Sequence, residues 1–316
     1  MPAADTGGFA PSGRKEAGIP WQADAAVDLG SAITSASCAA PIILTIDRAV
    51  VQAMAGTQTL ARALGAGFVD LLRRPHHFLG QIGFWMTVGV YGATYTTANL
   101  IDTFCERKLD ANDPKSAYVH GTAKLFLTTA VNMSSGVAKD AAFARMFGAS
   151  AASPAPTPML TYGLFATRDV LTIGAGFIVP SLVSSALVSS GTLDEKRAPA
   201  AAQIISPMGM QLVCTPLHLS ALNVYNMPDA TLKERAADVG KTMPQATIAR
   251  MFRFCAAYGI GGLMNKALLK KGRDYVAEQY GAIDLLDKPP RVKPTVTAGL
   301  VRRMSSDGVD LEPRRR

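Results

Sequence analysis

Charged residues are scarce in this chain of 316 residues and are missing from four long stretches. Asp, Glu, Lys and Arg make up 18% of the sequence, against roughly 25% in ordinary globular chains. None of them occurs in residues 29–46, 75–101, 170–193 or 198–228. A helix needs about 20 predominantly apolar residues to cross a bilayer, so these stretches predict membrane-spanning helices. Their many small residues suit close helix packing in a membrane.

Motifs for catalysis and for cofactor binding are also missing. The sequence has no Walker A loop, no dinucleotide-binding glycine pattern placed after a strand, no H-E-x-x-H and no G-x-S-x-G, which are the common signatures of nucleotide-binding and hydrolytic enzymes. The four cysteines are scattered and form no C-x-x-C pair, so no zinc site is indicated. We therefore predict a protein that is not an enzyme and that has neither a cofactor nor a metal.

The two ends of the chain differ from its middle. Residues 1–24 contain several Gly and Pro but no apolar core of a secretory signal, and we expect a flexible extension there. Residues 276–316 hold much of the net charge of +8 and read as a basic, flexible tail. The tail lacks the interleaved aromatic residues of a nucleic-acid surface. Membrane lipids are therefore the expected contact and nucleic acid is not.

A faint repeat runs through the apolar part of the chain. The segment Ala40–Arg48 is similar in sequence pattern to Thr215–Asn223, and a degenerate middle copy spans Val131–Lys139. A second, independent register aligns residues 92–99 with residues 173–180 and 258–265. Internal repeats with two apolar segments in each copy are typical of membrane transporters.

The repeat predicts an all-α membrane protein with six transmembrane helices in three pseudo-symmetric pairs. The predicted repeats are residues 25–112, 113–195 and 196–275. The predicted helices are residues 25–52, 78–105, 118–147, 159–190, 200–226 and 247–270. The connectors 57–74 and 228–244 carry apolar residues at helical spacing, and we expect amphipathic surface helices there.

Over residues 25 to about 271 the chain resembles the mitochondrial carrier family. The resemblance rests on Thr215–Leu219, on the prolines Pro41 and Pro216, and on the basic residues Arg48 and Lys139. It implies solute transport through a central cavity and a multi-pass location in the mitochondrial inner membrane.

The charged gates of that family are eroded in this chain. The resemblance assigns their acidic and basic positions to Ile43, Ser134, His218, Ile46, Val137 and Ala221. No ion pair forms among such residues. Two interpretations follow: apolar and hydrogen-bonding contacts close the cavity instead, or the protein is a scaffold that no longer transports.

Four residues are the candidate substrate contacts. Arg168 and Asp169 are charges inside an apolar segment, and ionisable residues at such positions are functional candidates because their burial is costly. The resemblance adds Arg253 on the sixth predicted helix and Thr87 on the second. A guanidinium binds a carboxylate while a neighbouring Asp binds an amino group. The alternative is that Arg168 and Asp169 only pair with neighbouring helices.

These observations favour transport of a small carboxylate or amino acid, hence an anionic or zwitterionic solute. The rival hypothesis is a non-transporting protein of the same fold that acts as a structural or accessory subunit of a larger membrane complex. A third hypothesis is a soluble helical bundle with a basic tail.

Overall fold

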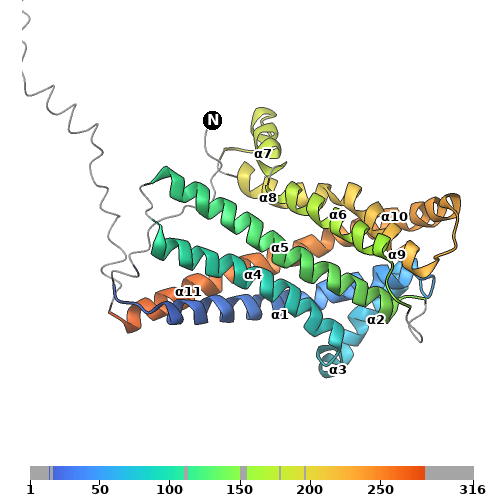
Figure 1. Ribbon diagram of the computed structural model, residues 1–316, viewed down its shortest axis with the longest axis horizontal. Helices are drawn as coiled ribbons and strands as arrows, with labels where there is room; N and C mark the ends of the chain where they lie inside the picture. Colours follow the sequence, from blue (N-terminus) through green and yellow to red (C-terminus); the bar gives the residue numbers. More distant parts are fainter. Residues whose placement is uncertain are drawn as a thin grey trace, which may run out of the picture.

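The protein is built from helices. The computed structural model describes residue 14 and residues 17–109, 113–149, 155–177, 179–195 and 197–281. Every regular element within these ranges is a helix, and together they form an elongated bundle (Figure 1). The predicted all-α class is therefore confirmed.

The helix α1 (Trp21–Met54) runs along the bundle and contacts most of its neighbours. The residues that it buries include Ala32, Ala36 and Ala40, which are fully buried. Small residues allow neighbouring backbones to approach. The partner helix α4 (Ile82–Lys108) has Gly92 at this contact, where an added Cβ would lie 3.8 Å from the Cβ of Ala36.

Among the described residues, α1 is also the one helix that is both long and apolar enough to cross a membrane. In its most apolar window, 56% of the residues are buried inside the protein. The core helix of a soluble protein passes the same test, so this helix alone does not establish a membrane protein.

The first predicted surface helix is confirmed as α2 (Leu60–Arg73), which is followed by the short α3 (Pro75–Leu79). Leu60, Ala63 and Gly67 are buried, whereas Leu72 is 80% exposed. A Cβ at Gly67 would lie 2.7 Å from Cγ2 of Thr45, so the glycine permits close packing of α2 on α1.

The middle of the chain forms α5 (Pro114–Phe147), α6 (Met159–Phe177) and α7 (Val179–Ser189). The sequence predicted one helix over residues 159–190, but the structure divides it into two. Pro180 lies at the start of α7, where proline is tolerated because the first turn has no intrahelical N–H bonds to lose. The helix α7 turns away from α6 and packs on α8 (Ala198–Gly209) (Figure 1).

The last part of the chain contains α9 (Gln211–Asn226), α10 (Leu232–Phe254), a π-helix η1 (Cys255–Gly262) and α11 (Leu263–Gln279). The second predicted surface helix and the sixth predicted membrane helix are here one continuous helical run. The run begins at a capping box formed by Thr231 and Glu234, and Pro244 lies inside it.

Six helices in three equivalent pairs are therefore not confirmed. The fourth and fifth predicted helices are each divided, and the sixth starts at Leu232, well before its predicted start at residue 247, because a strong N-terminal cap precedes it. The boundaries of the three repeats stay predictions. Residues 1–13 and 282–316, which hold most of the predicted extension and tail, lie outside the described residues.

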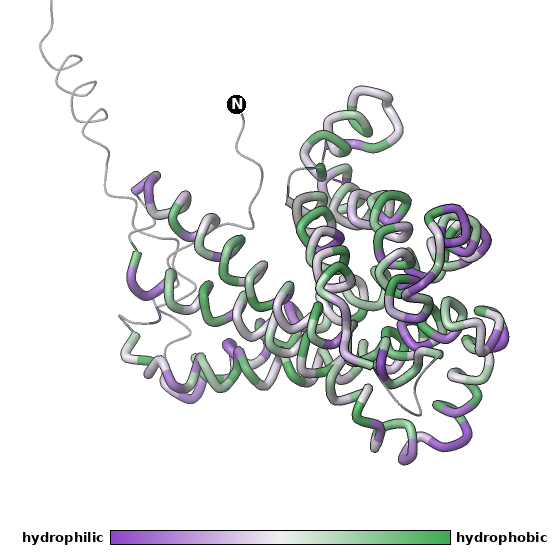
Figure 2. Tube along the Cα trace, turned by 45° about the vertical axis from the view of Figure 1, so that its right-hand side comes forward, coloured by the Kyte–Doolittle hydropathy of each residue, from purple (hydrophilic) through white to green (hydrophobic). Residues whose placement is uncertain are grey.

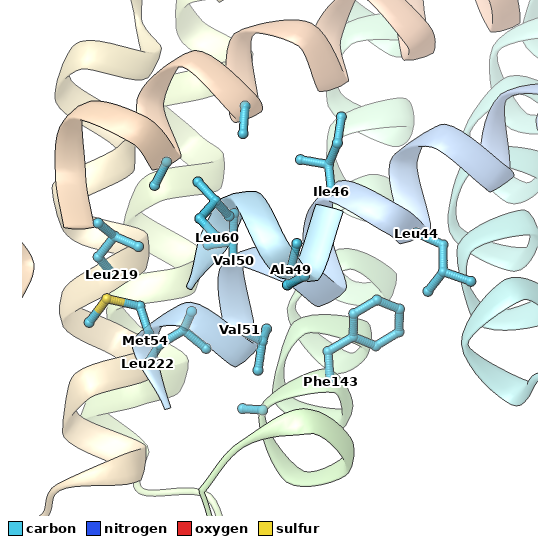
Figure 3. Packing of buried hydrophobic residues seen from close by; sticks show 14 of the residues in the cluster. Leu44, Ile46, Ala49, Val50, Val51, Met54, Leu60, Phe143, Leu219 and Leu222 are labelled. Atoms are coloured by element: carbon cyan, nitrogen blue, oxygen red, sulfur yellow. The ribbon is translucent and has the colours of Figure 1, made fainter. Parts of the chain in front are cut away.

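The largest apolar cluster surrounds the C-terminal half of α1. Figure 3 shows this half between α9, which contributes Leu219 and Leu222, and α5, which contributes Phe143. These three side chains are at most 1% exposed. The same half of α1 carries Asp47, so the apolar core anchors a charged group that enters the site described below.

Loss of the cap is expected to destabilise α10. The hydroxyl of Thr231 accepts from the backbone N–H of Glu234, and the carboxylate of Glu234 accepts from the backbone N–H of Thr231 at 2.8 Å. Thr231→Ala should lower the free energy of unfolding by about 1 kcal/mol. Thr59→Ala is the matched control, because Thr59 precedes α2 without a side-chain capping bond. Equal losses in thermal unfolding of the detergent-solubilised protein would contradict this role.

The same cap has a pH dependence. The backbone N–H of Thr231, and then its hydroxyl, hold the pKa of the Glu234 carboxyl below its ordinary value. A lowered folded-state pKa contributes stability above the unfolded-state pKa, and this stability is lost as pH falls through the lowered value. The difference between the parent protein and Thr231→Ala should therefore shrink in acid.

Candidate functional site

A cavity of about 350 Å³ lies between the central helices. Sites for small molecules typically have volumes of about 300–1,000 Å³. Its walls come from α4, α5, α6, α8, α10 and η1. The polar lining residues are Tyr91, Thr94, Tyr95, Thr128, Thr129, Asn132, Lys139, Asp140, Arg168, Asp169, Thr172, Arg250, Arg253 and Tyr258.

A chain of ion pairs connects four helices at this cavity. Asp47 of α1 contacts Nζ of Lys139 on α5 and lies 2.8 Å from Nε of Arg253 on α10. Lys139 lies 3.1 Å from its neighbour Asp140, and Asp140 lies 2.8 Å from Nη2 of Arg168 on α6. Together with Asp169 these residues form the cavity network. It joins α1, α5, α6 and α10.

The cavity network is deeply buried. Lys139 is 2% exposed, Arg168 is 3% exposed and Asp169 is 8% exposed. Taking charges out of water is costly unless each is paired and hydrogen-bonded. Three of the cations also face aromatic rings: Lys139 lies over Phe143, Arg168 over Phe165 and Arg253 over Tyr91. The network is thus compensated by both carboxylates and aromatic faces.

Arg250 is the exception in the cavity wall. It is 1% exposed, and its Nε donates to Oε1 of Gln211 at 3.2 Å. Among the described residues, no carboxylate lies within salt-bridge distance of it. Counted with the cavity network, Arg250 brings the cations to four against three carboxylates. The site therefore carries one positive charge that no described acidic group matches.

Several polar atoms at the cavity have no hydrogen-bond partner within the described ranges. They are Oδ2 of Asp169, Nε of Arg168, Nε of Arg253 and the hydroxyls of Thr128 and Thr129. Buried polar groups in proteins are nearly always hydrogen-bonded, so atoms of this kind beside a cavity are available to a ligand. The set includes a carboxylate oxygen and two neutral hydroxyls.

An aromatic wall closes one side of the cavity. Tyr91 and Tyr95 of α4 face it, and Tyr258 of η1 stacks on Phe254 of α10 with ring centroids 5.7 Å apart. The hydroxyl of Tyr95 donates to the carbonyl of Ala257 at 2.6 Å. This bond ties α4 to the π-helix, where carbonyls lack the regular α-helical partners.

A second group of charges lies at the end of the bundle where α1 begins. We call Arg14, Asp24, Asp28, Glu106, Arg107 and Arg273 the end cluster. Asp24 is contacted by Arg14 and Arg107, and Arg273 lies 3.1 Å from Asp28 and 3.3 Å from Glu106. Asp28 and Asp47 are 19 residues apart on α1, so the end cluster lies about 28 Å from the cavity network along that helix.

The end cluster is charge-balanced and joins α1, α4 and α11. Asn99 and Asn265 exchange hydrogen bonds of 2.9 and 3.1 Å between it and the cavity. These contacts hold the three helices together at this end. The cavity network, in contrast, has an excess of positive charge once Arg250 is counted.

Three of the four predicted contacts meet at the cavity. Arg168, Asp169 and Arg253 all line it. Thr87 does not: it is fully buried within α4, and its hydroxyl donates to the carbonyl of Gly83 at 2.8 Å. The predicted pairing of Arg168 with other helices also occurs, through Asp140 and His218.

Sequence reasoning missed Asp47 and Asp140 as parts of the site. It placed Arg250, one turn before Arg253, either on the same wall or at the membrane interface, and the structure places it on the wall. The positions that the resemblance assigned to gates, such as Ile43 and Val137, indeed carry no charge. The residues Asp47 and Lys139, a few positions further along the same helices, form the ion pair instead. The available signal for Asp47 was its position as the first charged residue after the apolar stretch 29–46.

No curated protein and no solved structure matches the chain. A family model does match, and its description is "Probable citrulline exporter". The matched residues are 31–272, which include the whole cavity network and, of the end cluster, Glu106 and Arg107. This match overturns the resemblance to the mitochondrial carriers, which rested on proline positions and segment spacing that unrelated membrane helices also have. The mitochondrial inner membrane has no support once that resemblance is removed.

The family is one of exporters and not of enzymes, so the protein is a membrane protein of the transport class and not an enzyme. Because the family model covers more than half of the chain, the protein belongs to the family described as probable citrulline exporters.

Proposed function

We propose that this protein is a multi-pass membrane protein that exports citrulline, a zwitterionic amino acid with a neutral side chain, through the cavity between α4, α5, α6 and α10. The observation that supports this most directly is the buried, charged cavity in the centre of the bundle. A cavity with both cations and carboxylates suits a solute that carries both charges. The family match supports citrulline as the substrate.

The outer surface of the bundle supports a location in lipid. Large apolar side chains are exposed on six of its helices: Trp85, Phe104, Phe126, Leu182, Leu212, Phe252 and Leu263 are all at least 57% exposed. In Figure 2 hydrophilic colour is concentrated toward opposite ends of the bundle, and its middle is mainly white and green. Charges inside and apolar residues outside are the arrangement that a bilayer requires.

The two groups of charges suggest how export proceeds. The end cluster closes one end of the bundle by holding α1, α4 and α11 together. Citrulline binds at the cavity network, and the end cluster and the Asn99–Asn265 bonds separate when this end opens. Pairs that break and re-form at a closed end are suited to a gate, because their net contribution to stability is modest.

Arg253 and Asp169 are the proposed direct contacts of the solute. Arg253 is ion-paired with Asp47, with Nε 2.8 Å from Oδ1, and its side chain lines the cavity. Asp169 uses Oδ1 for Arg168 and has Oδ2 without a partner. Arg168 lies between two carboxylates and its proposed role is to position Asp169.

Transport of citrulline should depend on Arg253. In proteoliposomes that contain the purified protein and internal citrulline, radiolabelled citrulline should exchange across the membrane. Arg253→Gln should lower the rate about tenfold or more, and it should still fold because Asp47 keeps Lys139 as a partner. Arg197→Gln is the matched control, because Arg197 is an exposed residue before α8.

The outcomes separate the hypotheses. Citrulline exchange that is lost in Arg253→Gln and kept in Arg197→Gln supports the proposal. No exchange by the parent protein, together with its stoichiometric recovery in a larger membrane complex, would overturn it in favour of an accessory subunit. An exchange rate that is unchanged in Arg253→Gln would contradict the proposal that citrulline passes through this cavity.

A further inference from the structure

The cavity presents different chemistry on its opposite walls, and this polarity bears on how a solute is oriented. The wall of α10 is cationic: Arg250 and Arg253 are one helical turn apart, share a face, and both line the cavity. Arg250 has no carboxylate partner among the described residues. Within that part of the chain, its hydrogen bond goes to the neutral side-chain amide of Gln211. A carboxylate is the group that this wall is missing.

The wall between α5 and α6 offers one acidic acceptor. Oδ2 of Asp169 is buried and unpartnered within the described ranges, while Oδ1 is engaged by Arg168. Asp169 and Arg253 are near enough to interact electrostatically. An ammonium group at Oδ2 and a carboxylate at the two arginines can therefore belong to one α-amino acid.

Access to Oδ2 of Asp169 depends on a glycine. Gly136 lies opposite on α5 and lines the cavity, and a Cβ at this position would lie 3.5 Å from Oδ2 with no other atom within 4 Å. Glycine in the middle of a helix is unfavourable relative to alanine. The missing methyl group thus leaves open the space directly beside the unpartnered oxygen.

The remaining polar atoms are neutral. Thr128 and Thr129 each have a buried hydroxyl without a partner among the described residues, and the neighbouring Asn132 accepts from Thr94 at 3.2 Å. Every carboxylate of the cavity network already has a cation partner. A cationic side chain would find no free acid here, whereas a neutral amide-like group finds hydroxyls that both donate and accept.

We propose that the cavity selects amino acids with a neutral, hydrogen-bonding side chain. The carboxylate binds Arg250 and Arg253, the ammonium group binds Oδ2 of Asp169 beside Gly136, and the side chain lies against Thr128 and Thr129. This inference rests on the proposed function and adds the orientation of the solute. It also predicts discrimination between citrulline and arginine, which have the same length and differ by the charge at the end of the side chain.

The test uses the purified full-length protein in detergent and binding of radiolabelled citrulline, with unlabelled compounds as competitors. Arginine should bind at least about tenfold more weakly than citrulline, since an uncompensated cation costs 1.4 kcal/mol or more. Citrulline with an amidated carboxyl group and N-acetylcitrulline should also bind weakly, because each lacks one of the two main-chain charges. Equal binding of arginine and citrulline would overturn the neutral side-chain site.

Two variants assign the charges. Arg250→Gln should bind citrulline about 30-fold or more weakly but bind the amidated compound as the parent does, since the carboxylate contact is already missing there. Gly136→Ala should weaken citrulline and leave N-acetylcitrulline unchanged. Gly121→Ala, on the same helix with no atom within 4 Å of its Cβ, should leave both unchanged.

Stability provides a separate readout. Because Arg250 is a buried charge without a carboxylate, Arg250→Gln should unfold at the same or a higher temperature than the parent in the absence of solute. A parent protein that neither binds nor exchanges citrulline would refute the proposed function. A parent that binds citrulline, with Arg250→Gln and the amidated compound showing additive losses, would refute only this orientation.

Discussion

Arg168→Met should be among the most destabilising substitutions in the protein, lowering the free energy of unfolding by about 3–5 kcal/mol. Arg168 lies 2.8 Å from both Asp140 and Asp169. Removing the guanidinium leaves Asp169 as a buried carboxylate with no cation partner among the described residues. Breaking a buried pair is costly for this reason, whatever the pair contributes in total.

The measurement is thermal and denaturant unfolding in detergent, with Arg250→Met as the matched control. Both variants remove a buried arginine and its methylene contacts, but only Arg168→Met leaves a carboxylate unpaired. Adding Asp169→Asn to Arg168→Met should recover part of the loss. If the two single variants were equally stable, or if the double variant were the least stable, pairing within the cavity network would not be the cause.

Arg273→Gln is expected to weaken the end of the bundle by a similar amount, about 3–5 kcal/mol. Its Nη2 lies 3.1 Å from Asp28, which is fully buried, and donates to the hydroxyl of Thr103 at 2.7 Å. Without the guanidinium, the 2.5 Å hydrogen bond from Thr103 is the one that the Asp28 carboxylate keeps among the described residues. Asp28→Asn in the same chain should restore part of the stability.

Lys270→Gln is the control for this prediction. Lys270 lies on the same helix and is paired with Asp274 at 3.3 Å, but both side chains are at least 65% exposed. Exposed pairs contribute roughly 0–1 kcal/mol, so this variant should unfold like the parent. A loss in Lys270→Gln as large as that in Arg273→Gln would mean that α11 is stabilised by overall charge and not by the end cluster.

The helices and part of the site were predictable because they depend on local properties. The apolar stretches mark the helices, and the spacing of Leu60, Leu64 and Phe68 predicts the amphipathic α2. Arg168 and Asp169 were found because a charge inside an apolar segment is costly and therefore conspicuous. These features can be judged one segment at a time.

The rest depends on contacts between distant segments. Asp47 and Lys139 are 92 residues apart, and no spacing rule relates them. The importance of Arg250 comes from a partner that it lacks, which cannot be seen before its neighbours are placed. The division between α6 and α7 at Pro180, and the continuity of α10 through Pro244, show that the same residue type ends one helix and is accommodated in another.

The family resemblance failed for a related reason. Prolines such as Pro41 and Pro216 are tolerated in membrane helices generally, because neighbouring groups compensate for the lost hydrogen bond. Such positions recur in helical membrane proteins of different ancestry, so their spacing is a weak guide to descent.

The helical run from Leu232 to Gln279 has one further consequence. It carries Arg253 at the cavity and Arg273 at the end cluster on a single rod, 20 residues and thus about 30 Å apart. Between them lie the π-helical turns Cys255–Gly262, and π-helical turns inside α-helices frequently occur at functional sites. A solute that binds Arg253 under the proposed function therefore contacts the same helical run that holds the end of the bundle together through Arg273.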